Sequence, residues 1–256
     1  MPTSEEWRLY FEENAHSLLD IPWHLGGDLK QSEADTIRKS LREFQAGETS
    51  EGKHLLRYSQ EYADRTGDHQ YVAAMRLFIL EEQRHARDLG RFLTVNGISL
   101  VRTTFTDVVF RRLRNLVGTL EISIAVLITA EIIAKVYYAV LRNATSSVVL
   151  RRICDQILRD EQRHVQFQAE QLAKLRAGRR PAGKVVVLSL QRFLYFGTVP
   201  VVWFFHREVI RRGGLPFGAW WAACWREYRG AFIEPLPDKV LEPVALLGSE
   251  DGSTKN

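Results

Sequence analysis

The chain has few cysteines, little net charge and no glycine-rich phosphate loop. Only Cys154 and Cys224 occur in 256 residues, which excludes a disulfide framework and a cysteine-rich zinc site. The formal net charge is only +4 and the basic residues are scattered, so we expect no nucleic-acid partner. The first residues lack the basic and apolar segments of a secretory signal. We therefore expect a cytoplasmic protein.

Long hydrophobic segments without a charged residue are also scarce. Two apolar windows, at residues 122–141 and 185–205, are each about long enough to cross a bilayer. The first contains Glu131 and Lys135, and the second contains Arg192. These internal charges favour buried helices of a bundle, so we expect no membrane partner.

The spacing of apolar residues predicts an all-α fold. Apolar positions recur at alternating steps of three and four, which is the pattern of bundle helices. Four long helices are expected, over residues 31–66, 69–95 and 107–143 and, after a turn at 144–147, onward to 177. Because the first and last pairs are joined by short turns and the middle connection is longer, an antiparallel four-helix bundle with one long crossover is predicted.

The remaining segments flank this bundle at 31–177. Residues 1–30 are expected to hold a short helix and a loop. Residues 184–234 are rich in aromatic side chains and predict two further helices packed on the bundle. Residues 235–256 are expected to form a partly disordered tail.

A repeated pentad organises the chain. Residues 81–85 and 160–164 both read acid, Glu, Gln, Arg, His. Within each pentad the Glu and the His are three positions apart, so on a helix they share one face. Each pentad can therefore aim a carboxylate and an imidazole at the same place.

Each pentad is preceded by a lone glutamate at nearly the same distance. Glu82 follows Glu51 by 31 positions, and Glu161 follows Glu131 by 30. In an antiparallel helix pair, this spacing brings each lone glutamate beside its pentad. Glu48 lies on the same seam as Glu51 and is kept as its alternate. The candidate metal ligands are Glu51, Glu82, His85, Glu131, Glu161 and His164.

Burial of these acids on the helix seams supports a metal site. Isolated carboxylates are too costly to bury, and two divalent cations would neutralise them. A donor set of carboxylates with a few imidazoles suits iron or manganese better than zinc. The flanking charged residues are expected to orient the histidines; they are Glu81, Arg84, Asp160 and Arg163.

Lys135 lies one helical turn after Glu131, and two hypotheses for it are kept. It is either a buried functional amine near the metals, acting with Tyr138, or a side chain that reaches the edge of the bundle.

At these residues the chain resembles the ferritin-like di-iron carboxylate superfamily, over about residues 34–177. The pentads look most like those of acyl-carrier-protein desaturases and bacterial multicomponent monooxygenases. Residues 46–49 (Ala-Gly-Glu-Thr) also look like the first-helix segment of rubrerythrins, which is the case for Glu48. The resemblance implies two irons, with a manganese–iron pair as the alternative, and dioxygen as co-substrate. Lys135 departs from the threonine that monooxygenases often have at this position.

The resemblance leads us to expect an oxygen-dependent oxidoreductase. It would act on a C–H or C–N bond of a small or apolar substrate by hydroxylation, desaturation or oxidative cleavage. An external electron donor, such as a ferredoxin or a reductase, is implied because nothing in the chain resembles a flavin or nicotinamide site. The alternative is a ferroxidase, peroxide-scavenging or iron-binding protein without an organic substrate. The aromatic C-terminal helices would wall a substrate channel, extend the core or form a homodimer interface.

Overall fold

The structure is a computed structural model that describes residues 1–49, 52–101 and 118–233. Within these residues the chain forms helices and no strand. A single 3-10 turn, η1 (Trp23–Leu25), follows the first helix. The helices are α1 (Ser4–Asn14), α2 (Gln31–Glu48), α3 (Lys53–Thr66), α4 (His69–Val95), α6 (Leu120–Ala144), α7 (Val148–Ala177), α8 (Pro181–Arg212) and α9 (Phe217–Phe232).

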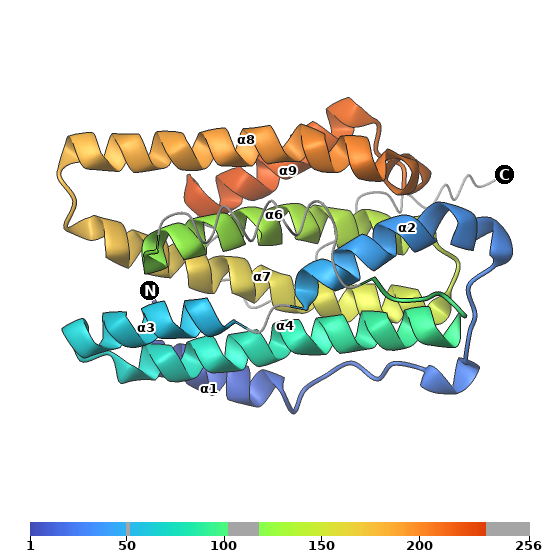
Figure 1. Cartoon of the computed structure of the whole chain (residues 1–256), viewed down its shortest axis with the longest axis horizontal. Helices are drawn as coiled ribbons and strands as arrows, with labels where there is room; N and C mark the ends of the chain where they lie inside the picture. Colours follow the sequence, from blue (N-terminus) through green and yellow to red (C-terminus); the bar gives the residue numbers. More distant parts are fainter. Residues whose placement is uncertain (50–51, 102–117, 234–256) are drawn as a thin grey trace, which may run out of the picture.

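The helices pack around a shared interior. α6 lies along α7, α4 contacts α7, and α1, α2 and α3 all pack on α4. α8 covers α6 and also contacts α2, with α9 packed on both α6 and α8. In Figure 1, α8 runs along the top, α6 and α7 lie in the middle, and α4 and α1 lie at the bottom. The faces of α4, α6 and α7 that carry the repeated motifs therefore meet inside the molecule.

Side-chain caps set where three of the long helices begin. Asp68, Thr119 and Ser147 each accept a hydrogen bond from the backbone N–H three residues further on. Such caps satisfy N–H groups that have no partner within the helix. The predicted limits of α4, 69–95, and the predicted end of α7 at 177 agree with the structure.

The prediction of one helix over residues 31–66 was wrong. α2 ends at Glu48, and α3 begins at Lys53. Gly52 has a φ of +64°, and a Cβ at this position would lie 2.5 Å from Cδ1 of Ile79. The apolar seam continues in phase across this break, which is why its periodicity alone gave no sign of it.

The predicted start of the third helix was also wrong. α6 begins at Leu120, after Thr119 has capped it, and not near residue 107. The predicted helical segment 107–117 lies outside the described residues, as does most of the crossover. The tail at 235–256 also lies outside them.

Among the described residues, two helices are long and apolar enough to cross a membrane by length and composition alone. In α6, 83% of the apolar window is buried inside the protein, but in α8 only 22% is buried. The expectation of a buried bundle helix therefore holds for α6 and fails for α8. α8 includes Pro200 and is one helix along its whole length.

Candidate metal centre

Four helices bring carboxylates and imidazoles into one buried cluster. α4 supplies Glu82 and His85, and α7 supplies Glu161 and His164, each pair separated by one helical turn. α6 adds Glu131 and α2 adds Glu48. Among the described residues, these side chains form two groups, and within each group the candidate ligand atoms all lie within 4.8 Å of one another. Glu82 belongs to both groups. The first group is Glu82, Glu131, Glu161 and His164, and the second is Glu48, Glu82 and His85.

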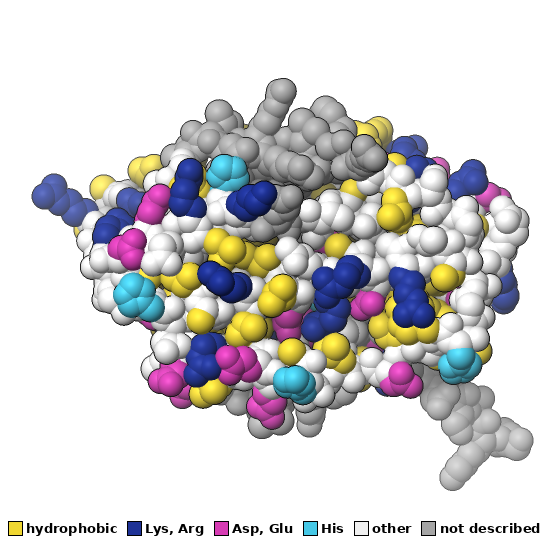
Figure 2. All heavy atoms as spheres, turned by 60° about the horizontal axis from the view of Figure 1, so that its bottom comes forward, with side chains coloured by type: hydrophobic (Ala, Val, Ile, Leu, Met, Phe, Trp, Pro, Cys, Tyr) yellow, Lys and Arg dark blue, Asp and Glu magenta, His cyan; other side chains and the backbone are white. Residues whose placement is uncertain are grey.

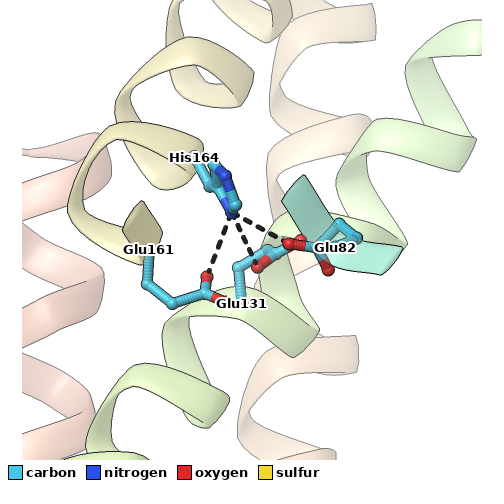
Figure 3. A group of neighbouring side chains, drawn as sticks. All are labelled: Glu82, Glu131, Glu161 and His164. Atoms are coloured by element: carbon cyan, nitrogen blue, oxygen red, sulfur yellow. Dashed lines mark ion pairs between the residues drawn. The ribbon is translucent and has the colours of Figure 1, made fainter. Parts of the chain in front are cut away.

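The first group converges on the ring of His164. Its Nδ1 lies 3.0 Å from Oε1 of Glu82, 3.8 Å from Oε2 of Glu161 and 4.0 Å from Oε2 of Glu131. Figure 3 shows the three carboxylates pointing toward this nitrogen from three helices. The ring of His85 faces the same cluster, with its Nδ1 3.5 Å from Oε1 of Glu82 and 3.8 Å from Oε1 of Glu161.

Several ligand atoms in this cluster have no hydrogen-bond partner, although they are buried. They are Oε1 of Glu82, both carboxylate oxygens of Glu161, and Nδ1 of His85 and of His164. Leaving buried polar atoms unsatisfied costs roughly 1–3 kcal/mol each. The atoms are those that divalent cations of the iron and manganese type bind. Four carboxylates also carry the charge that two such cations would neutralise, so the residues fit a pair of metal ions.

Each histidine is held by an acid from the opposite pentad. His85 Nε2 donates to Oδ2 of Asp160 at 2.9 Å, and His164 Nε2 donates to Oε2 of Glu81 at 2.9 Å. With Nε2 directed at these acids, Nδ1 of each ring faces the carboxylate cluster, where it could bind a metal ion once the ring is neutral. Glu81 and Asp160 thus each contact the histidine of the other pentad, and these contacts link α4 to α7.

Asn14 of α1 joins the two orienting acids, and sequence reasoning missed it. Its Nδ2 donates to Oε1 of Glu81 at 2.6 Å and to Oδ1 of Asp160 at 2.9 Å. Gln156 was missed too; its Nε2 lies 2.9 Å from both oxygens of Asp160. Gln156 precedes Asp160 by one helical turn, a signal that could have been found. Asn14 lies 146 positions from Asp160 and gives no local signal.

The two arginines of the pentads have different contacts. Arg84 donates through Nη2 to Oδ2 of Asp160 at 2.6 Å. Arg163 instead donates to Gln166 and lies over the ring of Tyr10. The structure thus places Arg84 against an orienting acid and places Arg163 at the edge of the site.

Crowding shifts the pKa values of the cluster. Burial and the neighbouring Glu131 raise the pKa of Glu82 and of Glu161 well above the usual range. Burial alone would lower the pKa of His164, but its interactions with Glu161 and Glu81 raise it well above the ordinary value. Burial also opposes ionisation of Asp160, yet contact with His85 holds its pKa below the usual range. Without a metal, the cluster therefore retains protons, while Asp160 stays ionised.

The structure places Glu48 at the cluster, whereas Glu51 lies outside the described residues. Tyr138 donates its hydroxyl hydrogen to Oε1 of Glu48 at 2.6 Å. Burial and the nearby Glu48 raise the pKa of Tyr138 well above its usual value, so its hydroxyl remains a neutral donor. Gln168 is a second supporting residue, with Nε2 3.3 Å from Oε1 of Glu131.

Lys135 is buried and points its ammonium group at α9. Its Nζ lies 2.7 Å from Oε2 of Glu227 and also donates to Gln162. These partners join α6 to α7 and α9. Neither of them belongs to the carboxylate cluster.

A cavity of about 150 Å³ adjoins the cluster. Glu48, Glu82 and Glu131 lie on its wall, together with apolar side chains of α6 and Val202 of α8. Glu43 and His206 also line it. Burial raises the pKa of Glu43, and it lowers the pKa of His206 to about 4, which favours the neutral form of that imidazole.

The aromatic side chains of α8 and α9 mostly pack against one another instead of lining this cavity. Phe196 stacks on Trp221 with ring centroids 5.5 Å apart, and Trp225 stacks on Tyr228 at 5.8 Å. The part of α8 that lines the cavity is Thr198, Val202 and His206.

Comparison of the chain with protein-family models, curated proteins and solved structures finds no match. A functional assignment therefore depends on the geometry and chemistry of the site.

Proposed function

We propose that this protein is an oxygen-dependent oxidoreductase of the ferritin-like di-iron class that acts on a small, apolar substrate. One observation carries the proposal: the ligand groups that share Glu82 open onto a cavity with mostly apolar walls. A protein that only stores or oxidises iron has no need of an organic cavity beside its ligands. The proposed substrate site is this cavity.

The two groups of carboxylates and imidazoles support two proposed metal positions. Glu131, Glu161 and His164 would hold one ion, Glu48 and His85 would hold the other, and Glu82 would serve both. Bound iron would supply the reaction with dioxygen activation, which protein side chains lack. The same ligands suit manganese, so a manganese–iron pair is the alternative.

The chain's own residues would orient the ligands and keep water out. Glu81 and Asp160 hold the histidine rings through Nε2, so that Nδ1 faces the cluster. Tyr138 holds one oxygen of Glu48 through its hydroxyl hydrogen. The apolar cavity wall of α6 would orient a substrate by shape and exclude solvent from it. Electrons would come from an external ferredoxin or reductase.

A cavity-filling variant tests this proposal. Ala134 lines the cavity, and an Ala134→Phe substitution would occupy space that a substrate needs without removing a ligand. With iron, dioxygen, a reductase system and a panel of small apolar compounds, we expect product formation to fall at least tenfold. Metal content, measured by mass spectrometry, should stay near two irons per chain. Ala73→Phe, at a half-buried position of α4 away from the cavity, is the matched control.

The same experiment identifies the alternative class. If Ala134→Phe and the wild type oxidise ferrous iron equally fast and neither converts any organic compound, the protein is a ferroxidase or an iron-binding protein. If the wild type binds no iron and no manganese, the metal proposal itself is wrong.

A further inference from the structure

The outer face of α8 is apolar and exposed over most of its length. Phe193 is 80% exposed, Leu190 is 63% exposed and Phe204 is 58% exposed. Val185, Val186 and Val201 continue this face along the helix. Single exposed apolar residues are ordinary, but a continuous patch of this kind marks an interaction site. We name these six residues the outer stripe of α8.

α8 is apolar on its outer side as well as on its inner side, which is not expected for a helix on the surface of a protein in water. Its inner side buries Tyr195, Val199, Val202, Val209 and Ile210 together with Gln191 and His206, and Oγ of Ser40 in α2 lies 2.8 Å from Nδ1 of His206. The outer stripe has no apolar cover among the described residues. On another side of the molecule, drawn at the bottom of Figure 1, Figure 2 shows basic, acidic and apolar side chains interspersed.

Positive charge borders the outer stripe at both ends. The only acidic residue of α8 is Glu208. Arg180 and Lys184 lie at its beginning, and Arg207 and Arg211 lie at its end. Basic residues at the edges of an apolar helix face are typical of helices that lie in the interface of an anionic membrane.

We propose that the outer stripe of α8 docks the protein on an anionic lipid bilayer, with the helix parallel to the membrane plane. The stripe is about 30 Å long at 1.5 Å per residue, and the basic side chains at its ends would reach lipid phosphates. Spanning is excluded by packing, because the inner side of α8 lies against α6, α2 and α9. This departs from the expectation, drawn from the sequence, of no membrane partner.

Charge favours lipid over a second copy of the chain. In a symmetric dimer the same patch faces itself, so the basic ends of two α8 helices would meet one another. Like charges placed together across an interface oppose association. An anionic surface instead complements the whole patch. Docking requires no metal chemistry, so it can fail or succeed independently of the proposed oxidoreductase function.

Vesicle flotation tests the proposal with the full-length, metal-loaded protein. The probes are vesicles of phosphatidylcholine alone and of phosphatidylcholine with phosphatidylglycerol. We expect binding to the anionic vesicles at least tenfold stronger than to the neutral ones. Leu190→Glu with Phe193→Glu should reduce binding to anionic vesicles at least tenfold. Lys184→Gln with Arg211→Gln should remove most of the preference for anionic lipid.

The matched control places two glutamates on the other side of the protein. Leu9 and Leu18 are 50% and 42% exposed, and Leu9→Glu with Leu18→Glu should bind vesicles like the wild type. Helical content by circular dichroism and metal content confirm that each variant is folded. Three results would overturn the proposal. They are failure to bind either kind of vesicle, a solution dimer that Leu190→Glu with Phe193→Glu dissociates, and binding that appears only when residues 234–256 are deleted.

Discussion

At the scale of single residues, Asp160 is the acceptor that holds His85, a ligand of the second metal position that we propose. Its carboxylate receives hydrogen bonds from His85, Arg84, Asn14 and Gln156. An Asp160→Asn substitution keeps the shape but removes the charge, and its amide would face other donors. The ring of His85 would then lose its anionic partner, so we expect affinity for one metal ion to fall about 10–100-fold.

Competition with a chelator of known affinity measures this loss. Asp64→Asn, at an exposed position of α3, is the control and should leave both affinities unchanged. Equal affinities in Asp160→Asn and the wild type would show that the hydrogen bonds of Asp160 do not support the site.

The sequence allows two hypotheses for Lys135. Its ion pair with Glu227 shows which substitutions can distinguish them. Removing one member of a buried pair leaves the other without its partner, which typically costs about 3–5 kcal/mol. Glu227 is partly exposed, with a side chain 23% accessible, so solvent screening should reduce the loss from Lys135→Met to about 1–2 kcal/mol. Lys135→Met with Glu227→Leu should recover part of it.

Chemical unfolding gives these free energies, and metal content is read in parallel. If Lys135 only joins α6 to α9, both variants keep the metal content of the wild type. A loss of metal in Lys135→Met would show instead that the amine acts at the metal centre.

At the scale of elements, the break between α2 and α3 positions Glu48. The break requires Gly52, because its positive φ disfavours any side chain and the added Cβ would meet Ile79. We expect Gly52→Ala to destabilise the protein by about 1–3 kcal/mol and to weaken metal binding through a displaced Glu48. Gly183→Ala in α8, where an added Cβ meets nothing within 4 Å, should leave metal binding unchanged and should not lower stability.

The same break shows how far helical elements follow from sequence. α4 and α7 were predicted closely because an apolar seam, a capping residue and a short turn all agree there. The seam of residues 31–66 also stays in phase, yet the chain leaves the helix after Glu48. Close approach to Ile79 of α4 imposes that departure, and periodicity within one segment carries no information about such a tertiary contact.

The candidate site shows the same difference between residues that are neighbours within one helix and residues that meet only through the packing of separate helices. Glu82 with His85, and Glu161 with His164, were found because each pair lies within one helical turn. Asp160 forms a hydrogen bond with His85 of the other pentad, and Glu81 forms one with His164. These contacts depend on the packing of α4 on α7, which no local pattern predicts. Asn14 required the docking of α1 as well, so no local pattern could have indicated it.

At the scale of the whole molecule, the buried cluster links stability to metal and to pH. Without metal, the pKa values of Glu82 and Glu161 lie above their ordinary values, so the folded chain binds more protons than the unfolded chain. Stability therefore falls as the pH rises above about 4.5, the ordinary glutamate value. His164, whose folded pKa is also raised, adds stability below about pH 6.5 that is lost as pH rises through its folded pKa. Both effects have the same sign.

Metal binding should remove this dependence, because bound cations keep the carboxylates ionised. We therefore expect the melting temperature of the chelator-treated protein to fall between about pH 6 and pH 8, and that of the metal-loaded protein to stay nearly level. The difference between the two should widen with pH, and metal binding should release protons. Glu82→Gln with Glu161→Gln, which cannot ionise at these positions, should have a flatter profile without metal than the wild type. A difference between loaded and metal-free protein that stays constant from pH 6 to pH 8 would mean that the cluster does not exchange protons for metal, and the charge argument for two cations would fail with it.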